Sequence, residues 1–173
     1  MQFFSGFSLV NEQAFFEAYR DDSAYTVAGF SYGAIKAFEE VYSTVMSGKR
    51  VERLQLFSPA FFQTKSEKFK RMQLMGYKRS SNAYLSAFLA SCFAPYEKQT
   101  LVHCETHSDE LSELLHYRWN VEKLRELQEK GVSIEIYLGE KDSVIDVVGA
   151  RELFLEVGTV TYIKNANHFL QTK

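Results

Sequence analysis

The stretch that decides the fold is "VAGFSYGA", residues 27–34. Within it Gly29, Ser31 and Gly33 match the pattern G-x-S-x-G, in which a sharp turn between a strand and a helix exposes the serine hydroxyl. The spacing has a steric reason, because glycine lets the backbone pass close to neighbouring elements on both sides of the turn. The alternative is a glycine-flanked serine that only turns the chain.

The residues on both sides of this turn favour a strand that leads in and a helix that leads out. Residues 24–30 are small, β-branched or aromatic, which is typical of a buried parallel strand. Residues 32–48 place Ile35, Phe38, Tyr42 and Val45 at helical spacing, and Gly48 suits the C-terminal end of that helix.

The same alternation of strands and helices continues along the chain. Asn11 is the expected N-cap of a helix that precedes the turn. Strands alternating with helices imply a parallel sheet covered on both faces. The expected strands are residues 1–4, 24–30, 51–60, 132–142 and 159–169, and the expected helices are residues 11–22, 32–48 and 147–158.

Residues 61–131 interrupt this alternation and contain no clear strand. Residues 80–96, 108–117 and 119–131 show helical periodicity. We therefore predict a core made of residues 1–60 and 132–173, with residues 61–131 inserted as a helical cap. Such a cap would cover the carboxyl edge of the sheet, where open α/β sheets bind ligands.

An acid and a histidine follow Ser31 at the ends of two later strands. Asp142 comes just after the strand at 132–142, and His168 stands in the loop that ends the last strand. The order Ser, Asp, His suits a site in which histidine takes the serine proton and aspartate fixes the imidazole tautomer. Asp146 and Glu140 remain alternatives for the acid, and a surface position remains an alternative for the histidine.

Two backbone N–H groups are candidates for holding a negatively charged oxygen beside Ser31. Tyr32 directly follows the serine, and its N–H is the first expected donor. Phe7 follows Gly6 in the loop after the first strand, and its N–H is the second expected donor. The alternative is that Ser5 and Gly6 form a simple turn.

A cluster of cations marks the start of the predicted cap. A local cluster of this kind attracts an acidic partner, although a solvated basic face is an equal alternative. Residues 65–79 contain one acid, Glu67, and six basic residues, which are Lys65, Lys68, Lys70, Arg71, Lys78 and Arg79.

Composition excludes several other classes of protein. The formal net charge of −2 gives no global attraction to nucleic acid or to a membrane surface. Cys92 and Cys104 form no disulfide framework, and with no apolar run of membrane-spanning length and no recognisable leader we expect a cytoplasmic protein. His103 and His107 are four residues apart, but no third zinc ligand at a suitable spacing is evident, so a structural role is favoured.

These motifs together resemble those of α/β-hydrolase esterases. "SGF" (5–7) stands where that family carries "HGF" or "HGW", "GFSYGA" (29–34) resembles its serine turn, and "GEKD" (139–142) and "NANHF" (165–169) resemble its acid and histidine loops. The resemblance implies a minimal α/β-hydrolase fold with about five mostly parallel strands, flanking helices and an inserted helical cap. Compared with that family, the chain starts at the third strand and leaves little room between "SGF" and the serine turn. Ser5 stands in place of the usual histidine.

The opening "FFSGFS", the small size and the helical cap are similar to the short pimeloyl-acyl-carrier-protein methyl ester esterases of bacterial biotin synthesis. This narrower resemblance implies a serine carboxylesterase without metal or organic cofactor, acting on an ester that an acyl carrier protein presents on its phosphopantetheine arm. A short-chain esterase or acyl thioesterase with the same three residues is an alternative. A catalytically silent module that binds the carrier protein is another.

Overall fold

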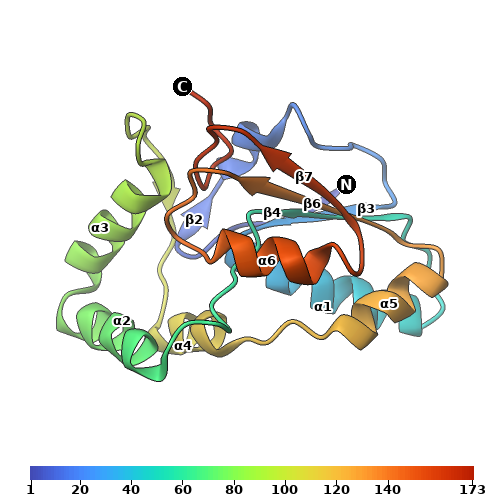
Figure 1. Cartoon of the computed structure of the whole chain (residues 1–173), viewed down its shortest axis with the longest axis horizontal. Helices are drawn as coiled ribbons and strands as arrows, with labels where there is room; N and C mark the ends of the chain where they lie inside the picture. The colour runs from blue at the N-terminus through green and yellow to red at the C-terminus, as the bar shows by residue number, and fades with distance from the viewer.

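The computed structural model describes residues 1–173, which form one five-stranded sheet with helices around it (Figure 1). All four strand pairings are parallel, as the sequence predicts. Parallel pairing brings the carboxyl ends of all five strands to one edge of the sheet. Across the sheet the strands are β1 (Gln2–Phe4), β3 (Thr26–Phe30), β4 (Arg53–Phe57), β6 (Ser133–Gly139) and β7 (Thr159–Ile163).

Three helices cover one face of this sheet. They are α1 (Tyr32–Met46), α5 (Val121–Glu129) and α6 (Val147–Phe154), which lie together below the strands in Figure 1. Alternate strand residues such as Leu54 and Ile136 point into this layer, which forms the larger hydrophobic core. Gly48 has a φ of +83° just beyond α1, so the predicted helix end is confirmed.

The opposite face of the sheet has a different cover from the one expected. The helix predicted over residues 11–22 is only a 3₁₀ helix, η1 (Glu12–Phe16), and Asn11 has a φ of 68° and makes no side-chain cap. Phe16 is fully buried there and stacks on Phe57, with 4.7 Å between the ring centroids. Aromatic packing over a short segment therefore replaces the expected α-helix. Asn11 has a left-handed backbone and the chain turns directly after Phe16, so only Glu12–Phe16 is helical.

The segment between β4 and β6 forms three helices before α5. In Figure 1 they stand to one side of the sheet, while α5 lies beside α1. The sequence pattern predicts α3 and α4 but not α2. The placement of a cap boundary at residues 61 and 131 stays a prediction. The three helices are α2 (Glu67–Arg79), α3 (Ser81–Phe93) and α4 (Ser108–His116).

The inserted segment also contains a short strand that the sequence pattern does not predict. β5 (Val102–His103) pairs antiparallel with β2 (Leu9–Val10) from the loop after β1. Two residues are too few to produce a periodic pattern, so only the tertiary structure defines this pairing. It ties the inserted segment to the loop that contains Phe7. No helix of the chain combines the length and apolar character that a membrane crossing requires.

Candidate active site

Ser31 occupies the sharp turn between β3 and α1 in a backbone conformation that side chains rarely adopt. Its φ is 51° and its ψ is −114°. The strain is held by hydrogen bonds on both sides, because the Ser31 N–H donates to the Phe57 carbonyl at 2.9 Å and the Ser31 carbonyl accepts from the Ala60 N–H at 3.1 Å. A Cβ atom at Gly29 would overlap the backbone of Gly33, which explains the first glycine of the motif.

His168 and Asp142 meet Ser31 at the carboxyl edge of the sheet. His168 Nε2 lies 3.0 Å from Ser31 Oγ, and His168 Nδ1 lies 2.6 Å from Asp142 Oδ2. The imidazole is fully buried. In the sequence, His168 is 26 positions from Asp142 and 137 positions from Ser31. The structure therefore brings together all three side chains that the sequence singled out.

The loops that carry Asp142 and His168 lie against each other because β6 and β7 are neighbours. The Lys141 N–H donates to the Ala166 carbonyl at 2.7 Å, across the two loops. Asp142 is also held from its own loop, since its Oδ1 accepts from the Val144 N–H at 2.8 Å. One carboxylate oxygen is thus fixed by backbone and the other faces the imidazole.

The two competing acids have structural partners elsewhere. Asp146 caps α6 by accepting from the Gly149 N–H at 3.1 Å, and it also accepts from the Thr64 hydroxyl at 2.7 Å. The hydrogen bond from Thr64 is the main cause that lowers the pKa of Asp146 below its ordinary value. Glu140 accepts from the Asn165 N–H at 2.8 Å. Neither carboxylate is hydrogen-bonded to His168, whose ring nitrogens pair with Asp142 and Ser31.

The two predicted N–H donors lie on elements that flank Ser31. Tyr32 is the first residue of α1, so its N–H is one of the first-turn donors that the helix itself leaves without a partner. The Phe7 N–H makes no hydrogen bond within the chain. Their joint action on a charged oxygen stays a prediction.

A buried carboxylate that the sequence did not single out holds the loop of Phe7. Glu12 is fully buried, and its Oε1 accepts from the Gly6 N–H at 2.6 Å. Its Oε2 has no hydrogen-bond partner. Burial raises the pKa of Glu12 above its ordinary value of 4.5, because burial disfavours the charged form. The sequence contains no signal that Glu12 holds this loop, since its position predicts an exposed residue in the first turn of the expected helix at 11–22.

A second polar contact joins the serine turn to the inserted helices. The Tyr32 hydroxyl donates to Glu113 Oε2 on α4 at 2.6 Å. Burial, and then this hydrogen bond, raise the pKa of Tyr32, so its hydroxyl remains a neutral donor. Glu113 was also missed, because a glutamate on an amphipathic helix gives no indication of which distant residue it contacts.

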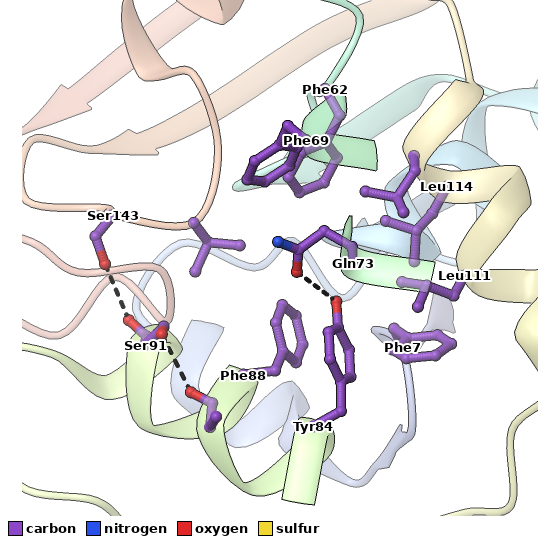
Figure 2. Close-up of a pocket in the computed structure, with 13 residues that line it drawn as sticks. Phe7, Phe62, Phe69, Gln73, Tyr84, Phe88, Ser91, Leu111, Leu114 and Ser143 are labelled. Carbon is purple, nitrogen blue, oxygen red and sulfur yellow. Dashed lines mark hydrogen bonds between the residues drawn. The ribbon is translucent and has the colours of Figure 1, made fainter. Parts of the chain in front are cut away.

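An apolar cavity of about 330 Å³ lies between α2, α3, α4 and the site loops. Phe7 from the loop after β1 and Val144, two residues beyond Asp142, both line it, so the cavity adjoins the residues around Ser31. Figure 2 shows its aromatic side chains, among them Phe62, Phe69 and Phe88, arranged around the open space. A cavity of this kind suits an apolar chain.

The basic residues of the inserted segment separate into an exposed set and two exceptions. Lys68, Arg71, Lys78 and Arg79 are exposed on α2, and their spacing places them on one face of the helix. Lys65 is half-buried. Lys70, predicted as part of the exposed cationic cluster, is instead buried: its side chain is only 7% exposed and its Nζ lies 2.8 Å from Glu67 Oε1.

The two histidines that suggested a zinc alternative lie on separate elements. His103 is in β5, where its Nδ1 lies 3.2 Å from the Ser8 carbonyl. His107 is the N-cap of α4, and its N–H donates to Glu110 at 3.1 Å. They therefore do not share one helical face. No group of three or more histidine, cysteine, aspartate or glutamate side chains has the geometry to hold a metal ion.

Comparison with known proteins shows the fold. No known protein-family model matches the chain, and no curated protein matches its sequence. Among solved structures, Est816, an N-acyl homoserine lactone degrading enzyme, superposes with a TM-score of 0.66 at 11% identity, covering 98% of this chain and 86% of that one. Naproxen esterase (carboxylesterase NP) from Bacillus subtilis gives a TM-score of 0.56 at 18% identity, covering 85% of this chain and 54% of that one.

An esterase from Exiguobacterium antarcticum superposes with a TM-score of 0.61 at 15% identity, covering 83% of this chain and 59% of that one. The chain therefore spans little more than half the length of these two esterases. At such low identities the likeness establishes architecture, and the chain has the α/β-hydrolase fold.

Proposed function

We propose that the chain is a serine hydrolase that cleaves carboxylic esters. The observation that carries the proposal is the continuous contact from Asp142 through His168 to Ser31, at 2.6 Å and 3.0 Å, with the serine in a strained turn between a strand and a helix. Nucleophilic catalysis by serine needs a base within hydrogen-bonding reach and a third group that orients the base.

In the proposed reaction Ser31 Oγ attacks the ester carbonyl carbon while His168 Nε2 takes the hydroxyl proton. The Asp142 carboxylate holds the proton on Nδ1 and stabilises the imidazolium that forms. The N–H groups of Phe7 and Tyr32 donate to the oxygen that becomes negative. His168 then returns the proton to the departing alcohol. Water, activated by the same imidazole, hydrolyses the acyl-serine and restores the hydroxyl.

The proposed substrate is the methyl ester of pimeloyl-acyl-carrier protein, which would yield pimeloyl-carrier and methanol in biotin biosynthesis. Two observations support an apolar acyl chain delivered by an acidic carrier. The cavity beside the site is lined mainly by aromatic and aliphatic side chains. On the outer face of α2, Lys68, Arg71, Lys78 and Arg79 surround the exposed Met72 and Met75, a combination that suits an acidic surface with an apolar centre.

Labelling with a fluorophosphonate tests the chemistry, because the probe bonds only to an activated serine. We expect wild-type protein to be labelled at Ser31 and to hydrolyse short-chain methyl esters. Ser31→Ala should lose both properties while its circular dichroism spectrum stays unchanged. Ser47→Ala, which removes an exposed hydroxyl at the far end of α1, is the matched control. Absence of labelling in the wild type would favour a catalytically silent binding module.

Complementation tests the substrate. A biotin auxotroph that lacks its methyl ester esterase should grow without biotin when it expresses the wild-type chain and should fail to grow with Ser31→Ala. Purified protein should then cleave pimeloyl-carrier methyl ester faster than a free short-chain ester or an acyl thioester. Ester hydrolysis without growth would indicate a general esterase, and faster thioester cleavage would indicate a thioesterase.

A further inference from the structure

One polar side chain in the apolar cavity has hydrogen-bonding capacity that nothing in the chain uses. The Gln73 side chain accepts at Oε1 from the Tyr84 hydroxyl, 3.0 Å away, while its Nε2 donates to no group of the chain. Figure 2 shows this amide nitrogen pointing away from Tyr84, into the space bounded by Phe69 and Phe88.

The other polar groups that line the cavity are already paired. The Ser91 hydroxyl donates to the Ala87 carbonyl at 3.1 Å, and the Ser143 hydroxyl donates to the Ser91 carbonyl at 3.3 Å. Burial raises the pKa of Tyr84 to about 12, so its hydroxyl keeps the proton that it donates to Gln73. The amide of Gln73 is therefore held from one side and offers its N–H groups to an occupant of the cavity.

The chemistry of the lining restricts what that occupant can be. An amide NH₂ group donates hydrogen bonds and accepts none, so it requires an acceptor. No lysine, arginine or histidine lines the cavity. A carboxylate would have to leave water without a cation to compensate it, whereas a neutral carbonyl needs only a donor.

We propose that Gln73 is a specificity residue that binds a second, neutral carbonyl group on the acyl chain, separate from the ester carbonyl that Ser31 attacks. This inference rests on the proposed function for the position of the scissile ester. It defines the substrate class as an ester whose acyl chain carries another ester, thioester or amide carbonyl. Gln73 lies on α2, so the same helix presents cations to solvent and this amide to the cavity.

Matched ligands test the proposal. Each dimethyl ester of a straight-chain dicarboxylic acid is paired with the methyl alkanoate of equal chain length, which lacks the far carbonyl. Binding is measured as Kd by ligand-observed NMR on Ser31→Ala protein, which does not turn the ligands over, and kcat/KM is measured on the wild type. At the best chain length the diester should be favoured about fivefold, which corresponds to one neutral hydrogen bond.

Substitution of the amide assigns the preference. Gln73→Met keeps the length of the side chain and removes its donors, so the ratio of diester to alkanoate should fall to about one. Gln99→Met makes the same chemical change on an exposed loop and should leave the ratio as in the wild type. Tyr84→Phe should reduce the ratio in part, because it frees the amide to rotate. Circular dichroism confirms folding of each variant.

The outcomes separate this inference from the proposed function. Turnover of both esters without a preference, or a ratio that Gln73→Met does not change, would overturn the inference alone. A Gln73-dependent preference in binding, with no turnover by the wild type, would overturn the esterase proposal and support the inference. A stronger preference for the monomethyl half-ester, whose far group is a carboxylate, or for an ω-hydroxy ester, whose far group is a hydroxyl, would contradict the assignment of a neutral carbonyl.

Discussion

The carbonyl oxygen of Phe4 lies where a Cβ atom of Gly33 would have to stand. Gly33 is the second residue of α1, and Phe4 is the last residue of β1. This contact places the start of the helix directly on the loop that contains Phe7. The second glycine of the serine turn therefore sets the distance between the two segments that would share a charged oxygen.

Gly33→Ala should destabilise the protein by at least about 2 kcal/mol, because backbone on both sides must move to admit the methyl group. Urea unfolding measures the change in free energy. Gly76→Ala is the matched control on α2, where a Cβ atom would meet Tyr84 Cδ2 at an ordinary 3.5 Å. That substitution should stabilise the protein by about 0.5–1 kcal/mol through helix propensity. Equal effects at the two positions would contradict the steric argument.

Asp142→Asn should lower kcat for a short-chain ester by about 10⁴-fold with little change in Tm. The asparagine amide can donate to Nδ1 of His168, which favours the tautomer that cannot accept the serine proton. The comparison is Asp146→Ala, which removes the cap of α6 and should cost about 0.5–2 kcal/mol of stability. If Asp146→Ala lowers kcat and Asp142→Asn lowers Tm, the assignment of Asp142 as the acid that orients His168 is wrong.

Glu12 should make the stability of the protein depend on pH. Its pKa is higher in the folded protein than the ordinary value of 4.5, so the folded state binds the proton more tightly than the unfolded state. The contribution to stability is then full below pH 4.5 and is lost as the pH rises through the folded pKa. The free energy of unfolding of wild type minus that of Glu12→Gln should decline over this range.

Urea unfolding of both proteins at a series of pH values from acid to neutral measures that difference. Other titrating groups contribute equally to the two curves and cancel. A difference that stays constant would contradict a shifted pKa for Glu12, and a difference that grows as the pH rises would show that its folded pKa is lowered instead.

Reversal of charge on the outer face of α2 tests the proposed carrier surface. Arg71→Glu combined with Lys78→Glu should lower kcat/KM for a carrier-linked ester about tenfold more than for a free short-chain ester, because only the carrier has an acidic surface to repel. Added salt should narrow the difference. Lys49→Glu with Lys130→Glu makes the same change in net charge at exposed positions that lie outside α2, and it should leave the ratio unchanged.

Lys70 supplies an internal check on that experiment. Its side chain is buried and its ammonium group is paired with Glu67, so Lys70→Met should leave the ratio between carrier-linked and free ester as in the wild type. A fall in the ratio for Lys70→Met equal to that of the double reversal would indicate a general disturbance of α2 rather than loss of a docking surface.

The sequence alone determined the parallel sheet, the turn at Ser31 and the loops of Asp142 and His168. These features depend on short-range properties: residues of one strand alternate, glycine is required where backbones touch, and parallel strands end at one edge. The meeting of Ser31, Asp142 and His168 followed from that topology. The replacement of the expected helix at 11–22 by η1 did not follow from the sequence, because the aromatic residues of that segment are compatible with either an α-helix or a short 3₁₀ helix.

Only the tertiary structure decided the contacts between side chains far apart in the chain. Glu12 beneath Gly6, Glu113 against Tyr32 and Gln73 in the cavity are polar residues whose patterns match any exposed helix. Lys70 has the same sequence pattern as its exposed neighbours but is buried. The role of a polar side chain depends on which distant groups replace the water around it. Packing in three dimensions decides those contacts, so they produce no periodic pattern in the local sequence.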